Sequence, residues 1–153
     1  MHKNVRQHRG CKSMDLESHY DQLNSKSLEA LHEGRYHVDN LIDSPSDSRL
    51  GITLLIRPNE QIKAKFQEFI SELKNVEPSQ YYYPSSDLHI TTLSIISCYD
   101  GFELSQISIN QYIDLLTEEL ANTQGFQIEF IGTALSQSGI LIKGFPSPTL
   151  NQI

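Results

Sequence analysis

The sequence predicts an α+β fold, in which a mixed or antiparallel sheet carries two helices on one face and follows an N-terminal helix. Three observations support this prediction. Segments with an apolar residue at every second position alternate with segments whose apolar residues recur every three or four positions. The order strand, helix, strand, helix, strand, strand combines crossovers with a final hairpin. The chain of 153 residues is also long enough to bury a core without disulfides or metal ions.

The N-terminal part is expected to hold a tail, one helix and a loop. Residues 1–13 are basic and poor in apolar side chains, so we expect a disordered tail there. Helical spacing predicts a helix over 15–33, with Ser13 as its cap and Gly34 at its end. The apolar face of this helix consists of Leu16, Tyr20, Leu23 and Leu31. The polar segment 39–48 has no periodicity and predicts a loop, which completes an N-terminal region of 14–48.

The main domain is expected over 49–153 and begins with a strand followed by a helix. Apolar residues alternate over 50–56, and Pro58 then lacks the N–H group that a strand ladder needs, so the strand ends there. An apolar stripe predicts an amphipathic helix over 60–74, capped by Asn59. The stripe consists of Ile62, Phe66, Phe69, Ile70 and Leu73.

The remaining elements complete the predicted sheet. Residues 88–96 are rich in Ile, Leu and Thr and predict a second strand. A capping box that starts at Ser108 opens a helix over 109–121. Alternation over 126–130 and the apolar run over 140–145 predict two strands that form a hairpin.

Composition and charge exclude several classes of function. The chain has 12 Lys and Arg against 19 Asp and Glu, a net charge of −7, which is a poor match for long duplex nucleic acid. No apolar run is long enough to cross a membrane, so we expect no membrane partner. Cys11 and Cys98 form neither a metal-binding spacing nor a disulfide framework, which favours a cytoplasmic protein without bound metal.

His89 and Thr91 form the motif with the most direct chemical interpretation. Residues two apart on a strand share a face, so the imidazole and the hydroxyl project together while Leu88 and Ile90 point to the core. Such a pair can catalyse a reaction at a phosphoryl group. The histidine transfers a proton near neutral pH, and the hydroxyl donates a hydrogen bond to a phosphoryl oxygen that gains negative charge. The alternative is a histidine that only packs or hydrogen-bonds locally.

These residues lie in a context that resembles a known family. The run Leu50-Gly-Ile-Thr-Leu-Leu-Ile-Arg-Pro58, a helix, and the run Leu88-His-Ile-Thr-Thr-Leu93 resemble the N-terminal half of the 2H phosphoesterases, the superfamily of 2′-5′ RNA ligases and cyclic phosphodiesterases. The resemblance covers about residues 49–153. It implies one lobe of a bilobal fold, with His89 as a catalytic acid–base group and Thr91 as its phosphate-binding partner. It also implies that no metal or other cofactor is needed, and that the substrate is a small nucleotide or RNA terminus with a cyclic phosphate or a 2′-5′ linkage.

The chain departs from the family pattern, in which each of two lobes supplies a histidine motif. The other histidines are His2, His8, His19, His32 and His37; none is followed two positions later by Thr or Ser, and all precede the first strand. We therefore expect a lobe truncated at its C-terminus, weak or inactive by itself. Its uncovered sheet surface is expected to allow self-association. The alternatives are a non-catalytic binding domain of the same fold and, more remotely, a protein labelled as a sugar mutarotase.

Four further residues are candidates for substrate binding. Tyr82 and Tyr83, in a Tyr-Tyr-Tyr run between two prolines, could stack on a base. Lys143 and Arg57 alternate with apolar residues on their strands and could reach a phosphate. The alternatives are tyrosine rings that cover the end of the sheet and solvated charges at its edges.

Overall fold

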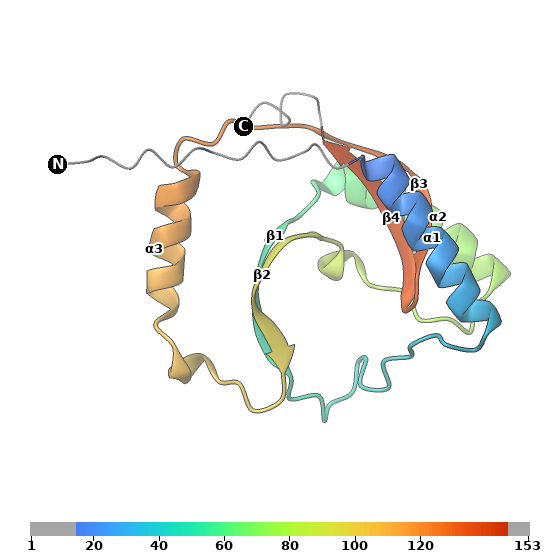
Figure 1. Cartoon of the computed structure of the whole chain (residues 1–153), viewed down its shortest axis with the longest axis horizontal. Coiled ribbons are helices and arrows are strands. Elements are labelled where there is room, and N and C mark those ends of the chain that lie inside the picture. Colours follow the sequence, from blue (N-terminus) through green and yellow to red (C-terminus); the bar gives the residue numbers. More distant parts are fainter. Residues whose placement is uncertain (1–14, 147–153) are drawn as a thin grey trace, which may run out of the picture. The chain divides into compact units, whose positions relative to one another are not determined.

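The computed structural model describes residues 15–146 and has an α+β architecture of three helices and two small antiparallel sheets (Figure 1). The α+β class is therefore confirmed, whereas the expected packing of two helices on one sheet face is not found in the described residues. The single predicted sheet is not found in the described residues, because the four strands pair as two separate hairpins. The chain divides into two compact units, whose described parts are 15–44 with 116–146, and 45–115.

The first unit consists of a helix and a hairpin. Its helix is α1 (Leu16–His32), and its hairpin joins β3 (Ile128–Ser136) to β4 (Gly139–Pro146). The strands pair antiparallel from Ile128↔Pro146 to Ser136↔Gly139, so the connection is a two-residue turn. This confirms the predicted hairpin. Gly132 has a φ of 69° at the point where the register shifts, a conformation that favours glycine and produces a bulge in β3.

Both ends of α1 are fixed by local hydrogen bonds. Asp15 is the N-cap, and its carboxylate accepts the N–H of Ser18. The predicted cap, Ser13, lies outside the described residues. At the other end Gly34 has a φ of 69°, and its N–H and that of the next residue bond to the carbonyls of Leu31 and Ala30. This is the pattern of a Schellman motif, so Gly34 ends the helix as predicted.

Side chains of α1 attach the helix to the hairpin. The Tyr20 hydroxyl donates to the carbonyl of Gly144 at 3.3 Å and accepts its N–H at 3.1 Å. The Asn24 side-chain oxygen accepts the N–H of Leu135 at 3.1 Å. Ala30 is buried, whereas Leu31 is 51% exposed. The predicted apolar face was therefore wrong at its C-terminal end, where the small residue takes the buried position.

Ser27 is buried on the same side of α1 as Ala30, and its hydroxyl has no hydrogen-bond partner among the described residues. A buried hydroxyl without a partner costs roughly 1–3 kcal/mol of stability. Alanine also has the higher helix propensity. We therefore expect Ser27→Ala to raise the free energy of unfolding by about 1 kcal/mol, measured by urea denaturation. Ser25→Ala, at an exposed position of the same helix, is the matched control and should change stability less. A loss of stability in Ser27→Ala would contradict this account.

The second unit contains the other hairpin and the helix α2. β1 (Leu50–Ile56) pairs antiparallel with β2 (Ile90–Tyr99), and α2 (Glu60–Val76) lies between them in sequence. Two short 3₁₀ helices follow: η1 (Ser85–Asp87) precedes β2, and η2 (Leu104–Gln106) precedes α3 (Ile109–Leu120). All the predicted helices and strands are therefore present.

The predicted cap and apolar stripe of α2 are both present in the structure. The Asn59 side chain accepts the N–H of Ile62 at 3.0 Å, which caps the helix. The predicted stripe is half-buried, whereas most of the other residues of α2 are exposed. No residue of the helix is fully buried, however. In the described part of the chain the buried apolar residues are Ala30, Phe102 and Ala134, so each unit has a small core.

β2 is irregular, although the sequence predicts a regular strand. Register shifts occur at three places, and at each of them the extra residue lies in β2. Gly51 of β1 accommodates one shift, because a Cβ atom there would lie 2.7 Å from the Ile96 carbonyl oxygen and 2.9 Å from the Cys98 nitrogen. Only a residue without a side chain fits this approach between the backbones.

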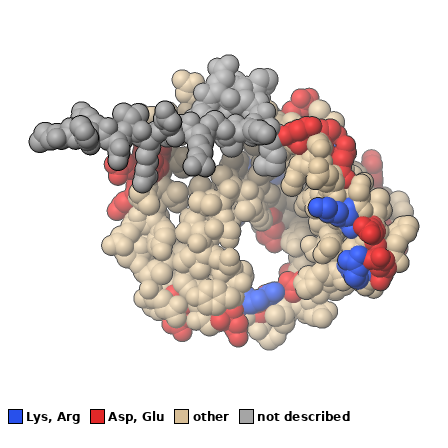
Figure 2. Space-filling view, in the orientation of Figure 1, with Lys and Arg blue, Asp and Glu red and all other residues tan. Residues whose placement is uncertain are grey.

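Charged side chains are scattered over the face drawn in Figure 2. The face drawn in Figure 2 shows acidic side chains in several separate groups, with large areas that carry neither charge. None of the described helices is long and apolar enough to cross a membrane.

Candidate functional site

The candidate site lies where β1 ends and β2 begins. His89 immediately precedes β2, and Thr91 is the second residue of the strand. Both are exposed, whereas Leu88 and Ile90 are half-buried. This is the alternation expected for extended backbone, with the imidazole and the hydroxyl reachable from solvent. The expectation of a full core position for Leu88 and Ile90 was wrong: both are only half-buried, and α2 packs little against β1 or β2.

The ring of His89 is held by the turn that precedes it. Its Nδ1 lies 2.5 Å from the carbonyl oxygen of Asp87, the last residue of η1. A carbonyl only accepts hydrogen bonds, so Nδ1 carries the proton of the neutral ring. Nε2 is then the unprotonated nitrogen, available to accept a proton from a ligand. The turn thus leaves Nε2, rather than Nδ1, as the ring nitrogen that can accept a proton.

Arg57 follows β1 at the end of the hairpin where His89 precedes β2. The pairs Leu55↔Thr91 and Ile56↔Ile90 set the register, and its continuation by one residue places Arg57 opposite His89. Residues that face each other across an antiparallel pair share a face. The Arg57 guanidinium donates a hydrogen bond to the carbonyl of Ser86, and His89 bonds to the next carbonyl along the chain. The two side chains therefore converge on the same turn of η1.

The three tyrosines separate into two groups. The Tyr82 hydroxyl donates to the Glu77 carbonyl at 2.9 Å, and the Lys74 ammonium lies 5.5 Å from the centre of its ring. Tyr82 is thus bound to the C-terminal end of α2. The rings of Tyr81 and Tyr83 pack edge to face, with centres 5.1 Å apart, and Tyr83 is 55% exposed. Tyr83 keeps an aromatic surface open to solvent, and Tyr82 is half-buried.

Lys143 belongs to the first unit and has partners there. Its ammonium lies 2.9 Å from a carboxylate oxygen of Glu17, and it also lies 5.8 Å from the centre of the Phe145 ring. His89, Thr91, Arg57 and the tyrosines all belong to the second unit. The structure therefore groups these residues in one unit and places Lys143 in the other.

The strongest electrostatic effect in the second unit lies at the other end of β1. Hydrogen bonds from the Arg49 guanidinium and N–H lower the pKa of the Asp47 carboxyl from 3.8 to about 2. Arg49 thus forms an ion pair with the Asp47 carboxylate. In residues 15–146 we find no group of three or more His, Cys, Asp or Glu arranged to hold a metal ion.

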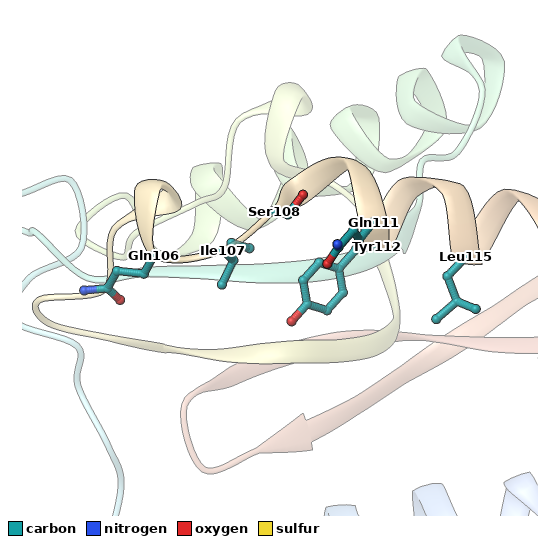
Figure 3. Close-up of a pocket in the computed structure, with 6 residues that line it drawn as sticks. All are labelled: Gln106, Ile107, Ser108, Gln111, Tyr112 and Leu115. Carbon is teal, nitrogen blue, oxygen red and sulfur yellow. The ribbon is translucent and has the colours of Figure 1, made fainter.

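A surface pocket of about 450 Å³ lies along the start of α3 (Figure 3). The six residues that line it come from η2, from the connection that follows and from α3; they are Gln106, Ile107, Ser108, Gln111, Tyr112 and Leu115. Their amides and hydroxyls can form hydrogen bonds, but none of the six residues is a His, Asp, Glu, Lys or Cys. The pocket is therefore not suited to acid–base chemistry, and it does not include His89.

We compared the chain with models of protein families, with curated proteins and with solved structures, and none of them matches it.

Sequence reasoning named His89, Thr91 and Arg57 separately but did not connect Arg57 with His89. The connection depends on the register between two strands that are separated in sequence by residues 57–89. Alternation along β1 places Arg57 on the face of Leu55, but only the pairing shows which residue of β2 lies opposite.

Proposed function

We propose that this chain is part of a metal-independent phosphoesterase of the 2H type, which acts on cyclic phosphates or 2′-5′ phosphodiester linkages of nucleotides. The observation that supports the proposal is the exposure and hydrogen bonding of the His89 imidazole. Its exposed imidazole has Nδ1 bonded to a backbone carbonyl, which leaves Nε2 as a base, and it lies on the same strand face as the hydroxyl of Thr91. The finer fold, a lobe of the 2H type, is part of the same proposal.

The proposed reaction needs two acid–base groups. In the hydrolysis of a 2′,3′-cyclic phosphate, His89 Nε2 takes a proton from water, whose oxygen forms a new bond to phosphorus. The bond from phosphorus to one ribose oxygen breaks, and that oxygen receives a proton from the second group. Thr91 donates a hydrogen bond to a non-bridging oxygen as its charge increases. The second histidine motif is not in this sequence, so another lobe or chain has to supply that group.

The substrate is small in this proposal. An exposed Tyr83 ring offers a stacking surface for a base, which is worth roughly 1–3 kcal/mol. The negative net charge disfavours long nucleic acid but not a single phosphate group. The rival function, a binding domain without catalysis, uses the same residues to hold a phosphate and needs no second histidine.

The decisive measurement is hydrolysis of 2′,3′-cyclic adenosine monophosphate by the protein expressed from its complete reading frame, with a chelator present. We expect cleavage that the chelator does not reduce, since the imidazoles and hydroxyls carry the proposed chemistry without a metal. Cleavage that stops with chelator would contradict the metal-independent mechanism. Binding of the nucleotide without any cleavage would favour the rival binding domain.

A further inference from the structure

We infer that Arg57 binds the phosphoryl group of the ligand and holds it against Nε2 of His89. This inference rests on the proposed function. It adds a binding residue that is not part of the H-x-T motif and that the family resemblance does not imply. Its ligand class is a nucleotide with an anionic phosphate at the ribose 2′ or 3′ position, as opposed to an uncharged nucleoside.

Geometry is the first argument. Arg57 stands opposite His89 when the register of β1 and β2 is continued by one residue. Its guanidinium reaches the Ser86 carbonyl, and the His89 ring reaches the Asp87 carbonyl, so adjacent carbonyls of one turn hold both side chains. The guanidinium and the exposed imidazole are thus held at the same turn, where one phosphate can meet both.

The unused donors of the guanidinium are the second argument. It carries five N–H donors in a planar fork, and a carbonyl oxygen has two lone pairs, so at least three donors remain for a ligand. This fork matches the oxygens of a phosphate, and such charge-assisted hydrogen bonds are about twice as strong as neutral ones. Because Arg57 is exposed, a ligand can reach these donors from solvent.

Charge is the third argument. Arg49 and Lys63 of the same unit pair with the carboxylates of Asp47 and Glu60, which offset their positive charges. The contact of Arg57 is to a neutral carbonyl, so this contact leaves its full charge in place. A positive charge close to His89 therefore attracts an anionic group.

The test measures affinity for adenosine 2′-monophosphate by following the His89 ring protons in NMR spectra of the complete protein. The variants are Arg57→Gln, Arg57→Lys and the control Arg49→Gln, which removes an equal charge from the other end of β1. We expect Arg57→Gln to weaken binding at least about tenfold, and Arg57→Lys to weaken it less. Arg49→Gln should stay within about twofold of the wild type, and binding of phosphate-free adenosine should be unchanged in all variants.

Each outcome decides between the two proposals. If the nucleotide shifts the His89 signals and Arg57→Gln binds it as tightly as the wild type, the inference about Arg57 is wrong while the proposed function stands. An equal loss for adenosine would show a structural role and also overturn the inference. No response of His89 in the wild type would overturn both. If circular dichroism shows that Arg57→Gln is unfolded, the affinity of Arg57→Lys for the nucleotide is the test. A wild-type affinity of Arg57→Lys would then contradict the inference.

Discussion

Replacement of His89 by Ala is expected to lower the rate of cyclic phosphate hydrolysis by about 10²–10⁴-fold, because the base that activates water is lost. Substrate affinity should change little if Arg57 and Thr91 hold the phosphate as proposed. Thr91→Val removes one hydrogen bond to the transition state and should therefore cost less than His89→Ala. Steady-state kinetics of the complete protein measure both effects, as changes in kcat and in KM.

His32→Ala is the matched control, since His32 is an exposed histidine in the last turn of α1 and belongs to the other unit. It should keep the wild-type rate. The rate of the wild type should depend on pH as a bell-shaped curve, with one limb for the base and one for the acid. Both apparent pKa values of this curve belong to the coupled pair of groups rather than to either group alone. A His89→Ala variant with wild-type turnover would refute a catalytic role for this strand.

Gly51→Val is expected to produce the largest loss of stability among single substitutions in β1. A Cβ atom at this position meets the Ile96 carbonyl oxygen at 2.7 Å and the Cys98 nitrogen at 2.9 Å, and both belong to the backbone of the paired strand. The two strands must separate locally to accept it, which costs roughly 1–3 kcal/mol or more. Urea denaturation monitored by circular dichroism measures this cost.

The control for this substitution is Gly125→Val. A Cβ atom at Gly125 meets nothing within 4 Å. The control therefore adds the same side chain without a clash and should change stability by less than about 0.5 kcal/mol. Equal stability of the two variants would show that the close approach at Gly51 has no energetic importance.

The sequence predicts the elements well because the signals for them are local. The cap at Asn59, the stop at Gly34 and the turn between β3 and β4 each depend on a few neighbouring residues, and all are confirmed. The strand that holds Thr91 was also found, although His89 lies one residue before it. The roles of these two residues stay predictions, as do the boundaries of the expected domain.

The features that sequence reasoning missed depend on contacts between distant residues. Leu31 fits the helical stripe as well as Ala30 does, but a small residue is the one that lies buried in α1. The bulges of β2 have no local signature, because Thr92 and its neighbours fit a regular strand as well as a bulged one. The approach of Arg57 to the turn before His89 likewise requires the register of two strands.

The bulges in β2 determine which edge of this two-stranded sheet can pair with a further strand. A two-stranded sheet has two open edges, at each of which another strand can add through backbone hydrogen bonds. The three bulges disturb the spacing of N–H and carbonyl groups along β2, whereas β1 is regular over its seven residues. We therefore expect any added strand to pair with β1 rather than with β2. Pro58, which has no N–H donor, limits such pairing at the end of β1 nearest His89.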